Sequence, residues 1–162
     1  MKTLIVCVSV SHGNTRKIAE TMADVLKARV LDPEAVDVTT VADYDLVGFG
    51  SGIFGMAFHR RLHDFVRELP PGQGKRAFVF ATRGGPNLTS WLYIRPMVRR
   101  LQAKGFEVVG TFSCPGFDTW LPLRLIGGLN KGRPNAADLD AARAFAAGLT
   151  AESSSSPTRS VG

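Results

Sequence analysis

One stretch near the start of the chain reads Cys7-Val8-Ser9-Val10-Ser11-His12-Gly13-Asn14-Thr15-Arg16. The residues that lead into it, 3–8, are rich in β-branched side chains and predict a buried strand. The apolar residues that follow it repeat at helical spacing and are Ile18, Met22, Val25 and Leu26. The stretch is therefore predicted to be a polar loop between the end of a strand and the start of a helix.

Such a loop has two interpretations. The start of a helix leaves backbone N–H groups unpaired and carries the positive end of the helix dipole, so a phosphate is stabilised there. The side chains of Ser9, Ser11, His12, Asn14 and Thr15 add further hydrogen-bond donors. Alternatively, Asn14 or Thr15 only caps the helix, since both residue types are ordinary N-caps. The loop by itself leaves both interpretations open.

The rest of the chain alternates between strand and helix patterns. Further strands are predicted over 29–32, 46–50, 77–81 and 106–112. Further helices are predicted over 58–69, from shortly before Pro96 (or kinked there) to Lys104, and over 136–149, with Asn135 and Asp138 at its cap. This alternation predicts an α/β fold, with a parallel sheet that helices cover on both faces.

Ligands bind such sheets beyond the carboxyl ends of the strands. Three loops at those ends are polar or rich in glycine, and they span residues 9–15, 51–58 and 82–87. Because the carboxyl ends of parallel strands lie at one edge, the three loops are predicted to converge. Their convergence favours the phosphate site over a simple cap.

Composition indicates one domain. The 162 residues, 44% of them hydrophobic, suffice for one sizeable core, which we place at residues 1–150. Residues 151–162 are polar and low in complexity, so we predict a disordered tail there. No apolar run reaches the roughly 18 residues that span a bilayer, and Cys7 and Cys114 are expected to be buried thiols without a disulfide. We therefore expect a cytoplasmic protein that does not insert into a membrane.

The chain is basic, with a formal net charge of +6. This charge suits an anionic partner, but the Lys and Arg residues are spread over the predicted helices instead of forming one tract. No nucleic-acid-binding module with aromatic platforms is present in the sequence, so nucleic acid is not expected as a partner.

The sequence supports three other kinds of site less well than the phosphate site, namely a dinucleotide site, a zinc site and a phosphorylation site. Residues 50–55 match G-x-G-x-x-G, but they follow the third strand and no acidic residue ends a strand about 20 residues later, as dinucleotide binding requires. His59 and His63 are one helical turn apart but lack the glutamate of a zinc-protease helix, so no metal is expected. A phospho-accepting receiver domain needs carboxylates where the chain has Ser9 and Ser51.

Several segments together resemble the flavodoxin family. The first loop looks like the flavodoxin phosphate loop, and the resemblance continues through 44–53, 82–86, 112–120 and 127–135, similar to bacterial single-domain members. It covers residues 2–149 and implies a flavodoxin-like three-layer sandwich with a five-stranded parallel sheet of order 2-1-3-4-5. The implied cofactor is flavin mononucleotide (FMN).

The resemblance also implies which residues bind FMN. The phosphate would contact the first loop, and the isoalloxazine ring would lie between the second and third loops. The residues implied are Ser9, Ser11, His12, Gly13, Asn14, Thr15, Ser51, Gly52, Ile53, Phe54, Thr82, Arg83, Gly84 and Gly85. Phe54 is the candidate for stacking on the ring, and Trp91 and Tyr93 are candidates for its other face.

Three functions follow from this interpretation. The leading one is an electron carrier that uses FMN and serves a redox partner protein, acidic in view of the basic chain, or a small-molecule electron acceptor. The second is an FMN-dependent oxidoreductase acting on a small organic substrate, quinone- or porphyrinogen-like, with residues 114–135 covering the flavin or forming a pocket. The third is a binding module that has lost the cofactor. The sequence does not decide the oligomeric state.

Overall fold

A computed structural model of the protein describes residues 1–10, 12–84, 90–116 and 132–154. Its strands are β1 (Thr3–Val8), β2 (Arg29–Leu31), β3 (Leu46–Phe54), β4 (Ala57–Phe58), β5 (Arg76–Arg83) and β6 (Glu107–Pro115). Its helices are α1 (Asn14–Leu26), α2 (Arg60–Glu68), α3 (Ser90–Ala103) and α4 (Ala136–Ser154), with the 3-10 turns η1 (Pro33–Ala35) and η2 (Val38–Asp43). Every strand and helix predicted from the sequence is present.

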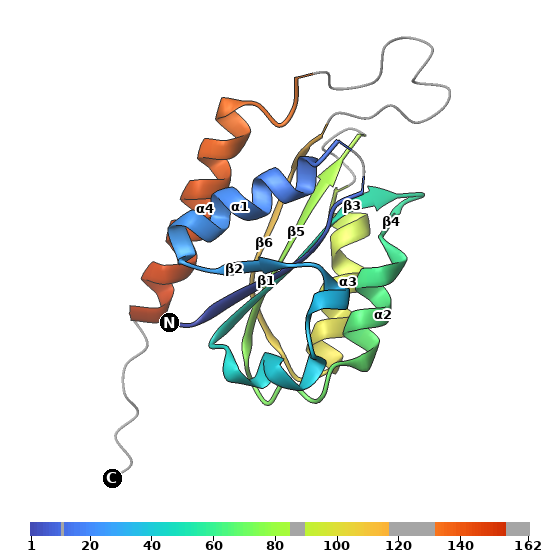
Figure 1. Ribbon diagram of the computed structural model, residues 1–162, viewed down its shortest axis with the longest axis vertical. Helices are drawn as coiled ribbons and strands as arrows, with labels where there is room; N and C mark the ends of the chain where they lie inside the picture. Colours follow the sequence, from blue (N-terminus) through green and yellow to red (C-terminus); the bar gives the residue numbers. More distant parts are fainter. Residues whose placement is uncertain (11, 85–89, 117–131, 155–162) are drawn as a thin grey trace.

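The fold has three layers, with helices on both faces of the sheet (Figure 1). Five strands run parallel in the order β2-β1-β3-β5-β6, and β4 pairs antiparallel with the end of β3. Helices α1 and α4 contact each other on one face, and α2 and α3 contact each other on the opposite face. The predicted order, counted without β4, is confirmed.

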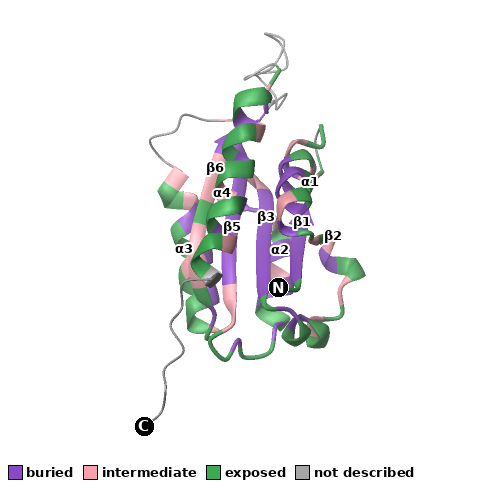
Figure 2. Cartoon of the chain, turned by 90° about the vertical axis from the view of Figure 1, so that its left-hand side faces the viewer, coloured by how far each residue is buried: buried purple, intermediate pink, exposed green. Residues whose placement is uncertain are grey.

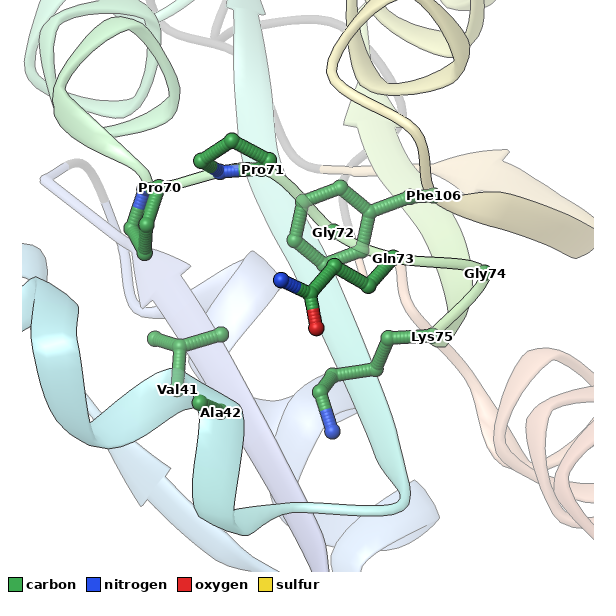
Figure 3. Close-up of a pocket in the computed structure, with 9 residues that line it drawn as sticks. All are labelled: Val41, Ala42, Pro70, Pro71, Gly72, Gln73, Gly74, Lys75 and Phe106. Carbon is green, nitrogen blue, oxygen red and sulfur yellow. The ribbon is translucent and has the colours of Figure 1, made fainter.

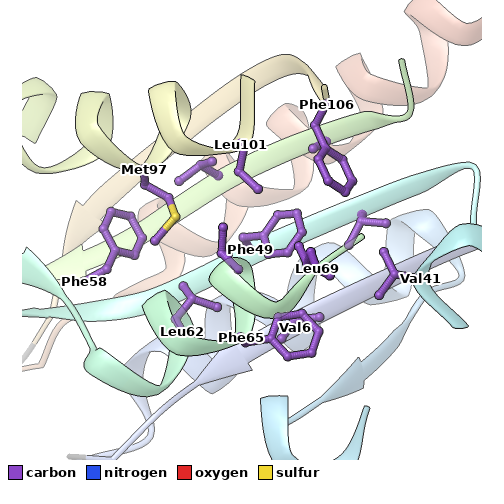
Figure 4. Close-up of a cluster of buried hydrophobic side chains, with 14 of the residues drawn as sticks. Val6, Val41, Phe49, Phe58, Leu62, Phe65, Leu69, Met97, Leu101 and Phe106 are labelled. Carbon is purple, nitrogen blue, oxygen red and sulfur yellow. The ribbon is translucent and has the colours of Figure 1, made fainter. Parts of the chain in front are cut away.

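Two hydrophobic cores lie on the two faces of the sheet, and the central strands β1, β3 and β5 between them are mostly buried (Figure 2). The core under α2 and α3 includes Phe49, Leu62, Met97 and Leu101 (Figure 4). The core under α1 and α4 includes Phe78 and Phe80 of β5. A strand buried on both faces explains why the sequence shows continuous apolar runs and no clean alternation.

Glycines in β3 make room for the aromatic rings of β5. Gly48 pairs with Phe78, and Gly50 pairs with Phe80. A Cβ added at Gly48 would lie 2.3 Å from the ring of Phe78, and one at Gly50 would lie 2.0 Å from the ring of Phe80. The two rings therefore lie directly over the backbone of β3, where only glycine leaves space for them.

Helices α3 and α4 lie where the sequence predicts helices, and α4 has the predicted cap. Helix α3 begins at Ser90, and Pro96 lies inside it. At α4 the predicted cap is confirmed: Asn135 Oδ1 accepts from the Asp138 N–H at 3.1 Å, and Asp138 Oδ2 accepts from the Asn135 N–H at 2.8 Å. Helix α4 continues past residue 150 to Ser154. The rest of the predicted tail, 155–162, lies outside the described residues.

Candidate functional site

The loops predicted to bind the cofactor lie at the carboxyl edge of the sheet. The chain leaves β1 at Val8 and enters α1 at Asn14, and β3 and β5 end beside this loop at Phe54 and Arg83. Ser11 and Gly85 belong to the predicted site but lie outside the described residues. The remaining predicted residues all lie at this edge.

The first loop leads into α1 without a capping side chain at the N-cap position. His12 and Gly13 both have left-handed backbone conformations, with φ of 52° and 65°. Gly13 is the N-cap of α1 and makes no side-chain cap hydrogen bond, and no acidic residue lies in the first helical turn. Among the described residues, and apart from its two chain neighbours, no atom would lie within 4 Å of a Cβ added at Gly13. Asn14 and Thr15 are the first residues of the helix itself, so the interpretation that one of them is only its N-cap is wrong.

Ser9 fixes the shape of this loop. Its Oγ accepts a hydrogen bond from the Arg16 N–H at 3.2 Å, which satisfies one of the N–H groups that a helix start leaves unpaired. The loop is thus closed onto the first turn of α1 by a hydroxyl of its own. Arg16 and the exposed Lys17 add two positive charges in that turn.

Thr15 connects the first loop to the third. Its Oγ1 lies 2.7 Å from Thr82 Oγ1, and both side chains are buried. Gly52 of β3 lies next to this pair, because a Cβ added there would be 3.7 Å from Thr15 Oγ1 and 3.1 Å from the ring of Phe54. The convergence of the three loops that the sequence predicts is therefore present.

The second loop is a β-hairpin, where the sequence predicted a loop over 51–58. Strand β3 continues to Phe54, and β4 returns beside it after a turn at Gly55 and Met56. Both turn residues have positive φ, 52° and 68°, which matches the tight turns that join antiparallel strands. The sequence interpretation missed the hairpin because methionine rarely adopts this backbone conformation.

Ser51 and Phe54 have different roles in the hairpin. Ser51 is fully buried, and its Oγ accepts from the His59 N–H at 2.9 Å and donates to the Gly52 carbonyl at 2.5 Å. Its hydroxyl therefore holds the base of the hairpin. Phe54 is 42% exposed, and its ring meets that of His59 edge to face at 5.4 Å. An exposed aromatic ring at this edge is available to cover a flat ligand.

Arg83 is buried at the end of β5. Its Nη1 donates to Ser113 Oγ of β6 at 2.5 Å, and the Gly116 N–H donates to its carbonyl at 2.8 Å. Burial lowers the pKa of the Arg83 guanidinium from its ordinary value. The Arg83 side chain thus reaches across to the last strand, β6.

Gly116 lies against the predicted phosphate loop, a placement that the sequence interpretation missed. A Cβ added at Gly116 would lie 2.9 Å from Asn14 Nδ2 and 3.3 Å from Asn14 Cβ. The backbone after β6 therefore packs directly against the side chain of Asn14. The signal was the Pro115-Gly116 dipeptide shortly after the strand predicted over 106–112, since a glycine there permits close approach of another segment.

The residues of the other weak motifs have structural roles. His59 caps α2 through Nδ1, which accepts from the Arg61 N–H at 3.2 Å, and His63 Nδ1 lies 2.9 Å from Arg100 Nη1. Burial, followed by the charge of Arg100, lowers the pKa of His63. Among the described residues no group of His, Cys, Asp and Glu could hold a metal ion. The G-x-G-x-x-G match lies within β3 and its hairpin, whereas a dinucleotide motif opens a helix.

Both cysteines are free thiols, as predicted. Burial raises the pKa of Cys7 and of Cys114 to about 12. Neither thiol is therefore a nucleophile at neutral pH.

A separate pocket of about 350 Å³ lies at the opposite edge of the sheet, where β3, β5 and β6 begin (Figure 3). Val41, Pro70, Pro71 and Phe106 form its apolar walls, and Lys75 lies beside it with its Nζ donating to the Tyr44 carbonyl. It is not part of the predicted cofactor site.

Comparison with known proteins identifies the family. A family model described as a flavodoxin domain matches residues 5–109. The chain belongs to the flavodoxin family, whose cofactor is FMN. Over 146 residues, 90% of this chain and 96% of the other, it is 40% identical to an uncharacterized protein of Methanocaldococcus jannaschii.

Solved flavodoxin structures share the fold. A Streptococcus pneumoniae flavodoxin is similar with a TM-score of 0.72 and 19% identity, covering 94% of this chain and 99% of that one. A flavodoxin from the domain Archaea is similar with a TM-score of 0.70 and 18% identity, covering 94% of this chain and 98% of that one. At these identities the similarity shows the fold alone.

The residues at the carboxyl edge fit FMN. The first loop offers a helix start with open space at Gly13, the hydroxyl pair of Thr15 and Thr82 lies below it, and Phe54 exposes an aromatic ring beside it. Helix starts of this kind stabilise phosphate. Among the described residues no helix is long and apolar enough to cross a membrane.

Proposed function

We propose that this protein carries electrons by means of FMN held at the carboxyl edge of the sheet. The observation that supports this proposal is the direct link between the three loops, through Thr15, Thr82 and Gly52. FMN supplies the redox chemistry when it is bound. The chain's own residues bind and orient it.

Each loop has a distinct role in this proposal. The phosphate is surrounded by residues of the first loop, namely Ser9, Ser11, His12, Gly13, Asn14 and Thr15. The positive end of the α1 dipole and the charges of Arg16 and Lys17 stabilise its negative charge. Phe54 covers one face of the isoalloxazine ring, flanked by Gly52 and Ile53. Thr82, Arg83, Gly84 and Gly85 flank the ring from β5. Ser51 contributes by holding the hairpin that carries Phe54.

The proposed location is the cytoplasm. Cys7 and Cys114 are both buried and make no disulfide, which fits a reducing compartment.

Loading the purified full chain with FMN tests the proposal. Free FMN is removed, and the absorption spectrum is followed during stepwise reduction and reoxidation, without and with a quinone. An electron carrier retains about one flavin per chain and is reoxidised slowly by the small molecule. A chain that cannot be loaded with FMN would refute the proposed function, and rapid, saturable reoxidation by the quinone would favour an oxidoreductase with a substrate of its own.

A further inference from the structure

Large apolar side chains are exposed at the carboxyl edge of the sheet. Among the described residues, six large hydrophobic side chains are exposed, and five of them lie at this edge. Val10 lies in the first loop. The other four are Phe54 at 42%, Met56 at 63%, Trp91 at 56% and Leu92 at 41% exposure, and we name these four the apolar rim.

The apolar rim comes from two segments that lie side by side. Phe54 and Met56 belong to the hairpin of β3 and β4, and Trp91 and Leu92 belong to the first turn of α3. Helix α3 contacts β4, and Figure 1 shows the start of the helix next to the hairpin. Exposed apolar side chains gathered in this way typically mark an interaction site.

Arginines border the rim. Helix α3 carries Arg95, Arg99 and Arg100, all exposed, and it contains no acidic residue. Arg95 lies one helical turn after Trp91, so the two side chains occupy the same side of the helix. Arg60 is the first residue of α2, and its side chain is 90% exposed, with Asp64 Oδ2 3.6 Å from its Nε. Positive charge therefore adjoins the apolar surface on the side of α2 and α3.

The cofactor loops carry the same sign of charge. Residues 9–17, 51–59 and 82–95 contain no Asp or Glu, but they do contain Arg16, Lys17, Arg83 and Arg95. These three segments therefore carry a net positive charge. A protein that approaches the edge is attracted if its own surface is acidic and repelled if it is basic.

We propose that the apolar rim and the arginines beside it form the docking face for an acidic electron-transfer protein. This inference rests on the proposed function, because the face surrounds the same edge that is to hold FMN. An apolar centre with a charged border is how transient partners are both held and steered. In each encounter the partner's redox centre loses one electron and the FMN site gains it, so no other reactant is needed.

A membrane surface fits the same residues less well. Side chains that bind membranes usually form one long stripe on an amphipathic helix. Here the apolar rim is divided between a hairpin turn and one helical turn around the cofactor loops. That arrangement brings a partner's redox centre close to the loops.

The test measures electron exchange between the FMN-loaded full chain and two small proteins of opposite charge. One is an acidic plant-type ferredoxin, reduced beforehand, which gives one electron to the oxidised FMN. The other is basic ferric cytochrome c, which takes one electron from the chain after its FMN has been reduced. Rates are followed by stopped-flow absorbance from about 0.02 to about 0.3 M salt, a range over which screening becomes strong. We expect the second-order rate constant with ferredoxin to fall several-fold with added salt, and the rate constant with cytochrome c to rise or stay level.

Charge-reversal variants locate the effect. Arg95→Glu combined with Arg99→Glu should lower the low-salt rate with ferredoxin at least about fivefold and flatten its salt dependence. Arg29→Glu combined with Arg143→Glu changes the net charge equally at exposed sites on β2 and α4, and should leave most of the rate intact. Met56→Asn removes apolar area at a position whose positive φ asparagine tolerates, and should lower the ferredoxin rate at every salt concentration.

Several results would contradict the proposed docking face. One is an equal loss of the ferredoxin rate constant in both double variants, and another is a ferredoxin rate constant that rises with salt. A dimer in size-exclusion chromatography that Met56→Asn dissociates would mean that a second copy covers the rim. Sedimentation with phosphatidylglycerol vesicles, abolished by the Arg95 and Arg99 changes, would assign the face to a membrane. Retained FMN in any of these cases would leave the proposed function standing, whereas failure to load FMN would refute that function first.

Discussion

The hydroxyl of Thr15, in the first turn of α1, lies 2.7 Å from the hydroxyl of Thr82, near the end of β5. The two residues are 67 positions apart in the sequence, and both side chains are almost wholly buried. One hydroxyl donates to the other, so each satisfies its partner in a place without ready access to water. The bond joins the predicted phosphate loop to the strand that carries the third loop.

Removing one hydroxyl should therefore affect both stability and FMN binding. Thr15→Val or Thr82→Val leaves the other hydroxyl buried without this partner, which costs about 1–3 kcal/mol in the free energy of unfolding. The double variant should cost less than the sum of the two, because it leaves no unpaired hydroxyl. Urea unfolding and FMN titration by fluorescence measure the two effects.

Thr21→Val is the matched control for Thr15→Val. Thr21 is also buried on α1, but its Oγ1 donates to the Lys17 carbonyl of the same helix, at 2.8 Å, and not to another loop of the described residues. This change should leave FMN affinity within about twofold. Strictly additive stability losses at Thr15 and Thr82, with unchanged affinity, would show that the pair does not support the site.

Most of the fold could be predicted because its signals are local. Each signal involves only residues that are close in the sequence. Examples are the β-branched run of β1, the helical spacing in α1 and the cap of α4 at Asn135. The alternation of strands and helices then leaves few ways to connect a parallel sheet. The convergence of the three loops follows from that topology alone.

The features that could not be predicted depend on distant contacts or rare backbone angles. The hairpin requires Met56 at a φ of 68°, and no local rule predicts methionine there. Gly116 approaches Asn14 from the segment after β6, which is distant in the sequence, and Arg83 turns toward Ser113 on the neighbouring strand. In each case the deciding partner is not a sequence neighbour.

Gly50→Ala should destabilise the protein strongly. Its Cβ would fall 2.0 Å from the ring of Phe80, inside a close-packed core that cannot expand. We expect a loss of about 2 kcal/mol or more in the free energy of unfolding. Combining it with Phe80→Leu should cost less than the two single changes together, since the smaller side chain frees the space. Additive losses in chemical unfolding would contradict this packing relationship.

Gly116→Ala should weaken FMN binding without unfolding the protein. The added methyl group would displace Asn14, whose Nδ2 lies 2.9 Å from that position. We expect about a tenfold loss of affinity, equivalent to about 1.4 kcal/mol. Gly148→Ala is the matched control. It lies in α4, where among the described residues no atom outside the neighbouring helix backbone lies within 4 Å of the new methyl group, and it should raise stability by about 1 kcal/mol. Equal FMN affinities in the two variants would show that Asn14 does not contribute to FMN binding.

The two buried thiols should make stability fall in alkaline solution. Burial raises the pKa of each from 9.0 to about 12, so the folded protein keeps protons that the unfolded chain releases between those values. This contribution is fully present below pH 9 and decreases as the pH rises, by at most about 1.4 kcal/mol per pH unit for each thiol. Urea unfolding at pH 7, 9 and 10 measures the decrease.

A variant with Cys7→Ala and Cys114→Ala is less stable at pH 7 but should lose less stability between pH 9 and 10. Parallel pH profiles for the two proteins would show that the thiols ionise as readily in the folded state as in the unfolded chain.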